Sequence, residues 1–238
     1  MSVAEKLASY DIQEPSIAQA FFAKHQGFLR LPGGVLALRD LILDLAVRGK
    51  LSQRSEQDND AELLLNEVVK QRDELGQSGV IRGARPFSPI DAKSFPFKLP
   101  DGWTWVFLEF LTQKMGAGST PLGGKKAYVD DGVAFLRSQN VWNEGLRLHD
   151  VARIPEATHE RMSGTHVMQG DVLLNITGAS IGRCALVPDD LGEANVSQHV
   201  AIIRLVDRRL RYFLHLCMIS PFFQRTIMDV QVGVSQHS

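Results

Sequence analysis

The chain has 238 residues, which is enough for one large domain or two small ones, and its 44% apolar content supports a buried core. A formal charge of −1 excludes a uniformly basic nucleic-acid binder but not a locally basic one. Two cysteines exclude a disulfide framework and favour a reduced, cytoplasmic setting. The chain starts without a signal-peptide pattern, and no apolar run approaches the roughly 18 residues of a membrane span, so we expect no membrane segment.

Residues 1–85 are predicted to form a helical region. An amphipathic pattern over 16–28 predicts a first helix, and a second is expected over 35–47, with Gly49 as its C-terminal cap. The second helix has apolar residues on two sides, so we expect both sides to be covered. One stripe consists of Val35, Leu38, Ile42 and Leu45, and the other of Leu36, Leu43 and Val47.

A third helix is predicted to begin at a capping box made by Asn59 and Glu62 and to end at Gly76 and Gly79. The apolar stripes of these helices favour a helical core, and the alternative is a docking or coiled-coil surface, for which only about two heptads are available. The candidate interface residues are Val35, Leu38, Ile42, Leu45, Leu64 and Val68.

Residues 86–100 contain four prolines and are predicted to be an extended linker. After residue 101 the pattern becomes aromatic and β-branched, with polar, glycine-rich loops between apolar runs. The fold class is therefore α+β: a helical region followed by a mixed α/β domain over 101–238 with long polar loops. Strands are expected at 103–108, 133–136, 171–176, 184–187 and 200–205, and helices at about 155–163 and 208–229, the latter restarting at Ser220-Pro221.

The sequence ITGASIGR, residues 176–183, is the strongest candidate for chemistry in this domain, because small residues at a strand end are typical of a phosphate loop. The spacing of neither G-x-x-x-x-G-K-[ST] nor G-x-G-x-x-G is present, so a glycine-assisted turn is favoured instead. Asp189 and Asp190 with Glu193 resemble a metal nuclease site, but no lysine follows Glu193. We therefore expect no catalytic residues and no metal site, and a domain with long loops and no chemistry of its own points to recognition.

Five stretches, taken in order, resemble the target recognition domain of the specificity (S) subunit of type I restriction-modification enzymes. Two upstream stretches resemble the conserved helical region of the same family. The recognition-domain stretches are LPDGWTWVFLEFL (99–111), GSTP (118–121), VAFLRSQNV (133–141), GDVLLNITGASIGRCALV (170–187) and ANVSQHVAIIRL (194–205), and the helical ones are LRDLILDLAVRGKL and AELLLNEVVKQRDEL.

The resemblance implies a non-catalytic, sequence-specific DNA-recognition subunit. Such a subunit carries two recognition domains, each reading one half of a bipartite target in double-stranded DNA, and it docks modification (methyltransferase) subunits, which assemble with restriction subunits. S-adenosylmethionine, ATP and Mg would then be bound by those partners, and this chain would need no cofactor. Only one helical region and one recognition domain are present here, so we expect either a fragment or a half-subunit that forms a homodimer.

The resemblance places the candidate DNA-binding residues on the polar loops of residues 101–238. Small residues of the 176–183 turn let the backbone approach DNA, while hydroxyl and cationic groups suit phosphate. Side chains with paired donors and acceptors suit base edges. The candidates are Lys125, Lys126, Arg137, Ser138, Gln139, Asn140, Thr177, Gly178, Ser180, Arg183, Gln198 and His199.

Two other functions stay open from the sequence. One is a nucleotide- or phosphate-binding enzyme that uses the 176–183 loop. The other is a protein-interaction scaffold that never touches DNA, although a scaffold has no need of so many Ser, Asn, Gln and Arg residues beside glycines.

Overall fold

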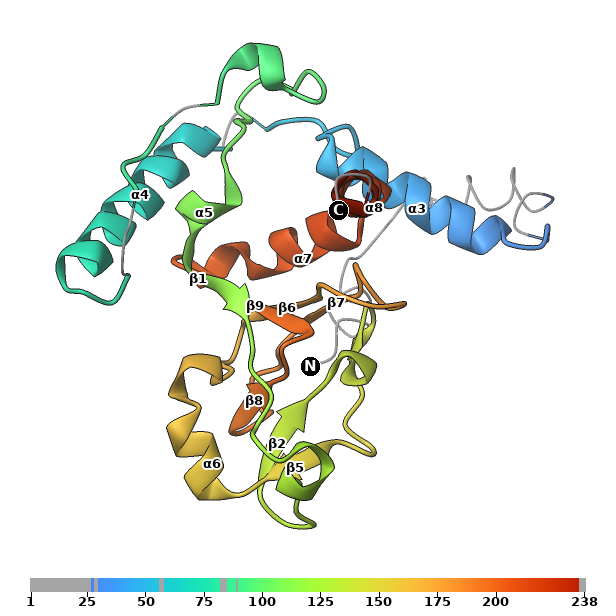
Figure 1. Ribbon diagram of the computed structural model, residues 1–238. Coiled ribbons are helices and arrows are strands. Elements are labelled where there is room, and N and C mark those ends of the chain that lie inside the picture. The colour runs from blue at the N-terminus through green and yellow to red at the C-terminus, as the bar shows by residue number, and fades with distance from the viewer. Residues whose placement is uncertain (1–26, 28–29, 56–57, 82–84, 89, 236–238) are drawn as a thin grey trace. The chain divides into compact units, whose positions relative to one another are not determined.

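The computed structural model describes residue 27 and residues 30–55, 58–81, 85–88 and 90–235 (Figure 1). The chain divides into two compact units, 1–42 and 43–238. The predicted helix over 16–28 falls almost wholly outside the described residues. The predicted boundaries at residues 85 and 100 stay predictions.

Helix α3 spans Gly34–Val47 and confirms the helix expected over 35–47. Gly49 has a positive φ of 65°, its N–H donates to Ala46 O, and the N–H of Lys50 donates to Leu45 O at 2.8 Å. This pairing of backbone groups satisfies carbonyls at the helix end, and it requires a left-handed residue at position 49. The predicted glycine cap is therefore confirmed.

Helix α4 spans Ala61–Gln77, and its predicted capping box is wrong. The N-cap is Asp60, not Asn59, and its side chain caps no backbone N–H, because the carboxylate pairs with Arg54 at 2.6 Å instead. The N–H of Ala61 donates to Gly102 O, so a backbone carbonyl from a distant segment takes over part of the capping. The helix passes through Gly76 and ends before Gly79, which has a φ of 78°.

The aromatic run at 103–107 forms no strand, contrary to the prediction. Its rings pack against other elements: Trp105 lies 4.9 Å from Phe97 and 6.2 Å from Phe222 between ring centroids. Strand propensity of aromatic residues reflects packing on a pleated surface, and here that packing comes from a helix and a loop. A short helix, α5 (Leu108–Leu111), follows, and the first strand, β1, is Thr112–Ala117.

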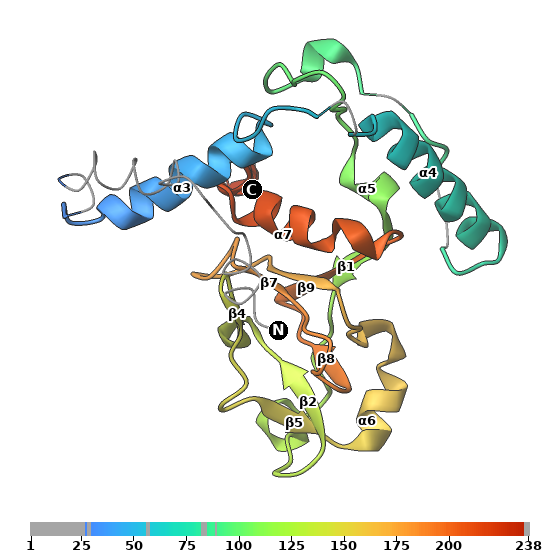
Figure 2. The same cartoon turned by 180° about the vertical axis from the view of Figure 1, so that it is seen from behind.

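The C-terminal unit contains two sheets and a small hairpin (Figures 1 and 2). Antiparallel pairs make up the four-stranded sheet, in the order β1-β9-β6-β7, and the three-stranded sheet has the order β5-β2-β8, with β2 and β8 parallel. The remaining strands are β2 (Val133–Leu136), β3 (Val141–Trp142), β4 (Gly145–Leu146), β5 (Ala152–Ile154), β6 (Val172–Asn175), β7 (Cys184–Leu186), β8 (Ala194–Val196) and β9 (Val200–Leu205).

Helices α6 (Glu156–Arg161), α7 (Arg211–Ile219) and α8 (Pro221–Ser235) complete the unit, with 3₁₀ turns at Ala92–Ser94, Gly124–Ala127, Ser138–Asn140, Ser163–Thr165 and Arg208–Leu210. The predicted restart at Ser220-Pro221 is confirmed, since the Ser220 hydroxyl accepts the N–H of Phe223 at the start of α8. Helices and sheets together confirm the α+β class. None of the helices in the described part of the chain is long and apolar enough to cross a membrane.

Strands β6 and β9 of the four-stranded sheet are buried on both faces, which explains why they read as continuous apolar runs. Neighbours along β6 and β9 alternate between two clusters: Leu173 and Ile202 face the three-stranded sheet, while Val172 and Ile203 face α7. Figure 1 shows α7 over this sheet on the side away from β2 and β5. The loops at the strand ends are thus held by a core with two layers.

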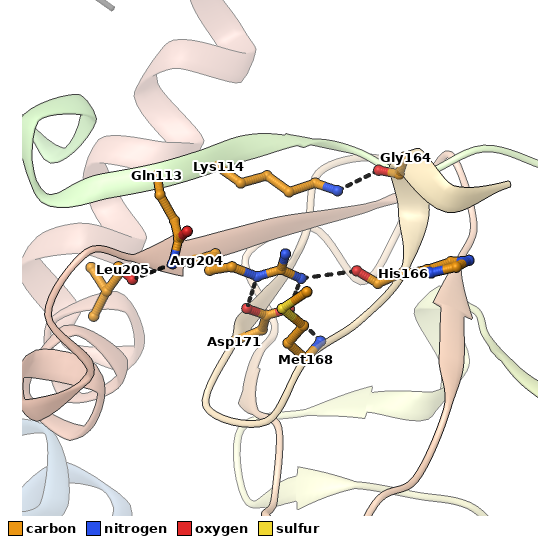
Figure 3. A network of polar contacts seen from close by, with 8 residues as sticks. All are labelled: Gln113, Lys114, Gly164, His166, Met168, Asp171, Arg204 and Leu205. Carbon is orange, nitrogen blue, oxygen red and sulfur yellow. Dashed lines mark hydrogen bonds and ion pairs between the residues drawn. The ribbon is translucent and has the colours of Figure 1, made fainter. Parts of the chain in front are cut away.

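A buried ion pair connects the sheet to the segment that follows α6 (Figure 3). Arg204 of β9 donates to both carboxylate oxygens of Asp171 at 2.8 Å and to His166 O at 2.9 Å. Asp171 is 1% exposed and also accepts the N–H of Met168. Lys114 of β1 donates to Gly164 O, and burial, together with the charge of Arg204, lowers the pKa of its ammonium group.

Candidate nucleic-acid interface

Three of the predicted polar segments meet at one place in the structure. Asn175, at the end of β6, donates to Ser138 O at 2.9 Å and to the Ser180 hydroxyl at 3.1 Å. Thr177 Oγ1 lies 2.6 Å from His199 Nδ1, and the N–H of Ile176 donates to His199 O. The turn 176–183 therefore lies beside the loops at 138–140 and 198–199.

The 176–183 segment joins two antiparallel strands, β6 and β7. Thr177 and Gly178 are exposed, and Ser180 and Arg183 are half-buried. Gly182 has a φ of 85°, and a Cβ there would lie 2.6 Å from the side-chain oxygen of Gln224, whose amide donates to Gly182 O. A phosphate loop leads from a strand into a helix N-terminus, whereas this turn leads into another strand, so it lacks the context of a nucleotide site.

Of the candidates around β2, Gln139 is exposed, whereas Asn140 is only 3% exposed. The Asn140 amide accepts the N–H of Arg137 and donates to Arg147 O, so it holds the loop in shape from inside. Arg137 is half-buried and donates to Asp150 O at 3.4 Å. We leave Asn140 out of the proposed contact residues and assign it a positioning role.

The other candidates are divided between this surface and a separate loop. Gln198 and His199 are exposed, with Gln198 Nε2 and His199 Nε2 3.5 Å apart. Lys126 is exposed on the 3₁₀ turn Gly124–Ala127, to which Lys125 also belongs. No hydrogen bond within the described residues ties that turn to the 176–183 segment.

A feature that the sequence analysis missed lies next to the turn. The guanidinium carbons of Arg147 and Arg183 lie 3.4 and 3.7 Å from the centroid of the Trp142 ring. The indole N–H of Trp142 donates to Gln139 O at 2.8 Å, which fixes the ring. Across the described parts of the chain, neither guanidinium forms a hydrogen bond or an ion pair.

The Trp142 stack is thus a pair of positive charges that an aromatic ring holds in place and that form no ion pair with any carboxylate in the described part of the chain. Cation–π contacts orient guanidinium groups without using their N–H donors. Those donors match phosphate oxygens or a guanine edge. The signal in the sequence was a tryptophan followed closely by Arg147, and the approach of Arg183 from a distant part of the chain could not be read from it.

Some of the predicted interface residues are exposed, and others are buried or half-buried. On α3, Val35 is 64% and Ile42 43% exposed, whereas Leu38 is buried and Leu45 half-buried. Leu64 and Val68 of α4 line an apolar cavity of about 720 Å³, and Val68 itself is fully buried. Only the exposed residues of α3 are available to a partner in the conformation described.

Comparison with known proteins finds sequences that are similar to this chain. The chain is 41% identical over 186 residues to the EcoEI type I restriction enzyme specificity subunit of Escherichia coli. This match covers 76% of the chain and 31% of that protein. The chain is 43% identical over 80 residues to the EcoAI specificity subunit of Escherichia coli, covering 34% of the chain and 14% of that protein. The chain thus spans about a third or less of the length of these relatives.

Two solved structures are similar as well. The HsdS subunit from Thermoanaerobacter tengcongensis is 18% identical, with a TM-score of 0.37, covering 85% of this chain and 50% of that chain. A chain from a structure of the assembly of the type I R-M system is 17% identical, with a TM-score of 0.38, covering 92% and 50%. No family model matches the chain.

The sequence matches confirm the predicted resemblance. The chain is a relative of the specificity subunits of type I restriction-modification enzymes. More particularly, its longest match among those described is to about a third of the EcoEI subunit.

Proposed function

We propose that this chain is a non-catalytic DNA-recognition module that reads one half of a bipartite target in a type I restriction-modification system. The observation that carries the proposal is the Trp142 stack, which holds Arg147 and Arg183 at the 176–183 turn with no acidic partner among the residues that the structure describes. The similarity to specificity subunits supports the same function.

Each part of this surface offers a different kind of contact to DNA. The exposed backbone of Gly178 allows close approach, and the guanidinium groups of the Trp142 stack suit phosphate or guanine. Gln139 and Gln198 are exposed amides, which can pair with an adenine edge. Phosphate contacts would set the position on the duplex, and the amides would supply base selectivity.

The partners are proposed from the family. The exposed apolar residues of α3 would dock the modification subunit or a second copy of the chain, because clustered apolar groups exposed on one helix favour an interface. S-adenosylmethionine, ATP and Mg would be bound by the modification and restriction subunits. Methylation and cleavage would then be their reactions.

The two alternatives are less well supported by the same geometry. A phosphate-using enzyme would need a helix after the 176–183 loop, and β7 stands there. A scaffold that never meets DNA gives no reason for two unneutralised arginines stacked on one indole. DNA recognition accounts for both features.

Selection from a random duplex pool tests the proposal. The chain is mixed with the modification subunit encoded beside it, and retained DNA is sequenced after several rounds. We expect one short motif to be enriched. The affinity for a duplex that carries this motif, measured by fluorescence anisotropy, should exceed the affinity for a shuffled duplex by a factor of about 10³ or more, which is typical of specific binding. Retention without any enriched motif would contradict sequence recognition.

A further inference from the structure

A second cluster of polar side chains lies away from the Trp142 stack, where α6 meets the segment before β8. Glu156 and His159 are one turn apart on α6, and Glu193 precedes β8 in the chain. One ligand atom from each of the three lies within 4.8 Å of the others. Figure 2 shows α6 beside β8, at the end of the C-terminal unit that lies away from α7.

The imidazole of His159 is the buried member of this cluster, at 6% exposure. Its Nδ1 lies 2.6 Å from Asn195 Oδ1. The Asn195 amide nitrogen donates to Met162 O and to Thr165 Oγ1, so the oxygen of that amide must face the imidazole. A carbonyl oxygen can only accept, so Nδ1 of His159 carries a proton and donates it.

This assignment leaves the lone pair of neutral His159 on Nε2. Within the described residues, no hydrogen bond satisfies that nitrogen, and it is not among the fully buried polar atoms that lack a partner, so Nε2 reaches solvent although most of the side chain is buried. The Nε2 lone pair is therefore open to a ligand that arrives from solvent. The two carboxylates of the cluster do not occupy it when ionised, because they donate no hydrogen bond.

The ring of His159 is also held against rotation. His166 stacks on it with 3.8 Å between ring centroids and an interplanar angle of 4°, and His166 Nε2 donates to His159 O at 2.7 Å. An imidazole whose Nδ1–H is bonded to an amide oxygen and whose plane is fixed has the arrangement that proteins use to orient a metal-binding histidine.

The geometry points to a divalent metal site made by Glu156, His159 and Glu193, with zinc as the ion that fits best. A ligand set of one imidazole and two carboxylates suits zinc, which takes N and O donors and completes four-coordination with water. Magnesium and calcium prefer sets of oxygen ligands only, so they are expected to bind more weakly. This inference is independent of the proposed DNA recognition.

The charges agree with a dication. Two carboxylates and a neutral imidazole give the cluster a formal charge of −2, which one divalent ion offsets. Arg153 lines the same surface hollow as the two glutamates, but its guanidinium donates to Gly132 O at 2.7 Å. No ion pair between Arg153 and either glutamate exists in the described structure.

A bound ion would clamp α6 to the segment that leads into β8. Glu156 and His159 would hold it from the helix, and Glu193 from the segment before the strand, which pairs in parallel with β2. In the sequence, Glu193 stands near Asp189 and Asp190 only, and that pattern predicts no metal site. The partners in the structure, Glu156 and His159, lie more than 30 residues away in sequence, which is why no local motif indicates them.

Calorimetric titration of the full chain with zinc chloride tests the site. We expect wild type to bind at this site and Glu156→Gln and Glu193→Gln each to weaken that binding tenfold or more, since each removes a charged ligand while keeping side-chain size. Glu160→Gln, on the exposed side of the same helix, is the matched control and should bind as wild type does. Cobalt in place of zinc should give a visible absorption band that both ligand variants lose.

Three results would overturn the site: no zinc binding by wild type, zinc affinity that survives either ligand substitution, or equal loss in Glu160→Gln. Circular dichroism of the three variants is needed to check that they are folded, so that loss of binding is not mistaken for unfolding. Failure of zinc binding leaves the DNA selection experiment unaffected, which keeps the two proposals separate.

Discussion

At the scale of single residues, the Trp142 stack allows the most direct test of DNA contact. Arg147→Ala or Arg183→Ala removes one unneutralised charge, so each should weaken binding on all duplexes. If each arginine contacts one phosphate, the slope of log K against log salt should fall in magnitude by roughly 0.9 per substitution. Anisotropy titrations at several salt concentrations, with the modification subunit present, give that slope.

Arg161→Ala is the matched control for this experiment. Arg161 is exposed on α6 and donates to Thr158 Oγ1, outside the proposed contact surface. It should leave the slope unchanged. If all three alanine variants change the slope equally, the stack has no special part in binding. If an arginine instead reads a guanine, its loss should also relax selectivity at one base pair.

The reactivity of the two cysteine thiols is a second property that can be tested at this scale. Cys184 and Cys217 are both buried and unpaired. Burial raises the pKa of the Cys217 thiol to about 12 and raises that of Cys184 further. Because the thiolate is the reactive form, neither should react quickly with Ellman's reagent at pH 8 in the native chain, and both should react in guanidinium chloride. Rapid reaction of the folded chain would contradict the described burial.

At the scale of secondary-structure elements, the Asp171–Arg204 pair should be the most sensitive polar contact of the sheet. Asp171→Ala leaves the Arg204 guanidinium without its carboxylate in a site that is only 14% exposed. Removing one partner of a buried pair costs about 3–5 kcal/mol, which urea denaturation followed by circular dichroism would measure as a fall in the free energy of unfolding.

Asp189→Ala provides the comparison for that measurement. Asp189 is 69% exposed, and its nearest guanidinium, from Arg208, lies 3.5 Å away. Exposed pairs contribute about 0–1 kcal/mol because water screens them. A loss for Asp171→Ala no larger than that for Asp189→Ala would mean that the buried network does not hold β9 to the segment after α6.

The elements that the sequence predicted well are those whose signal is local. The apolar runs of β2 and β9 and the Ser220-Pro221 restart all lie where expected. The aromatic segment 103–107 was mistaken for a strand because its packing partners, such as Phe222, come from far along the chain. Strand β1 has the polar sequence TQKMGA and was missed, since its place is set by pairing with β9.

The residues of the candidate site also differ in how well the sequence predicted them, for the same reason. The turn 176–183 and its neighbours were found, because glycines and polar residues between strands mark exposed loops. That Asn140 would be buried and that Arg147 would stack on Trp142 could not be read from the sequence. Both depend on how residues 137–147 fold back on themselves around the β3–β4 hairpin, which local pattern does not encode.

At the scale of the whole molecule, the charge of the C-terminal part limits how tightly the chain can hold DNA by itself. Residues 101–238 contain 13 Lys and Arg against 14 Asp and Glu. With few phosphates neutralised, counterion release contributes little, so binding by the chain alone should be weak and sensitive to salt. Gel shifts with and without the modification subunit should show a large gain in affinity when it is added. Tight binding at high salt without a partner would contradict this expectation.

Association through α3 is the remaining property of the whole molecule that can be tested. Val35 and Ile42 lie seven residues apart on one stripe of that helix and are 64% and 43% exposed, with Leu36 and Leu41 also exposed. A helix with this much apolar surface in water is expected to bury it against a second copy or the modification subunit. Leu45, half-buried, is a poorer target because its substitution would also disturb the chain's own packing.

The double variant Val35→Asp with Ile42→Asp should therefore abolish the complex while leaving the fold intact, because charge buried without a partner is costly at an interface and harmless in water. Lys50→Asp changes the net charge by the same amount at an exposed polar position just beyond α3 and should associate as wild type does. Light scattering on the chain alone, and again with the modification subunit, measures the outcome. A wild-type chain that stays monomeric at high concentration and binds no modification subunit would show that the exposed face of α3 is not an interface.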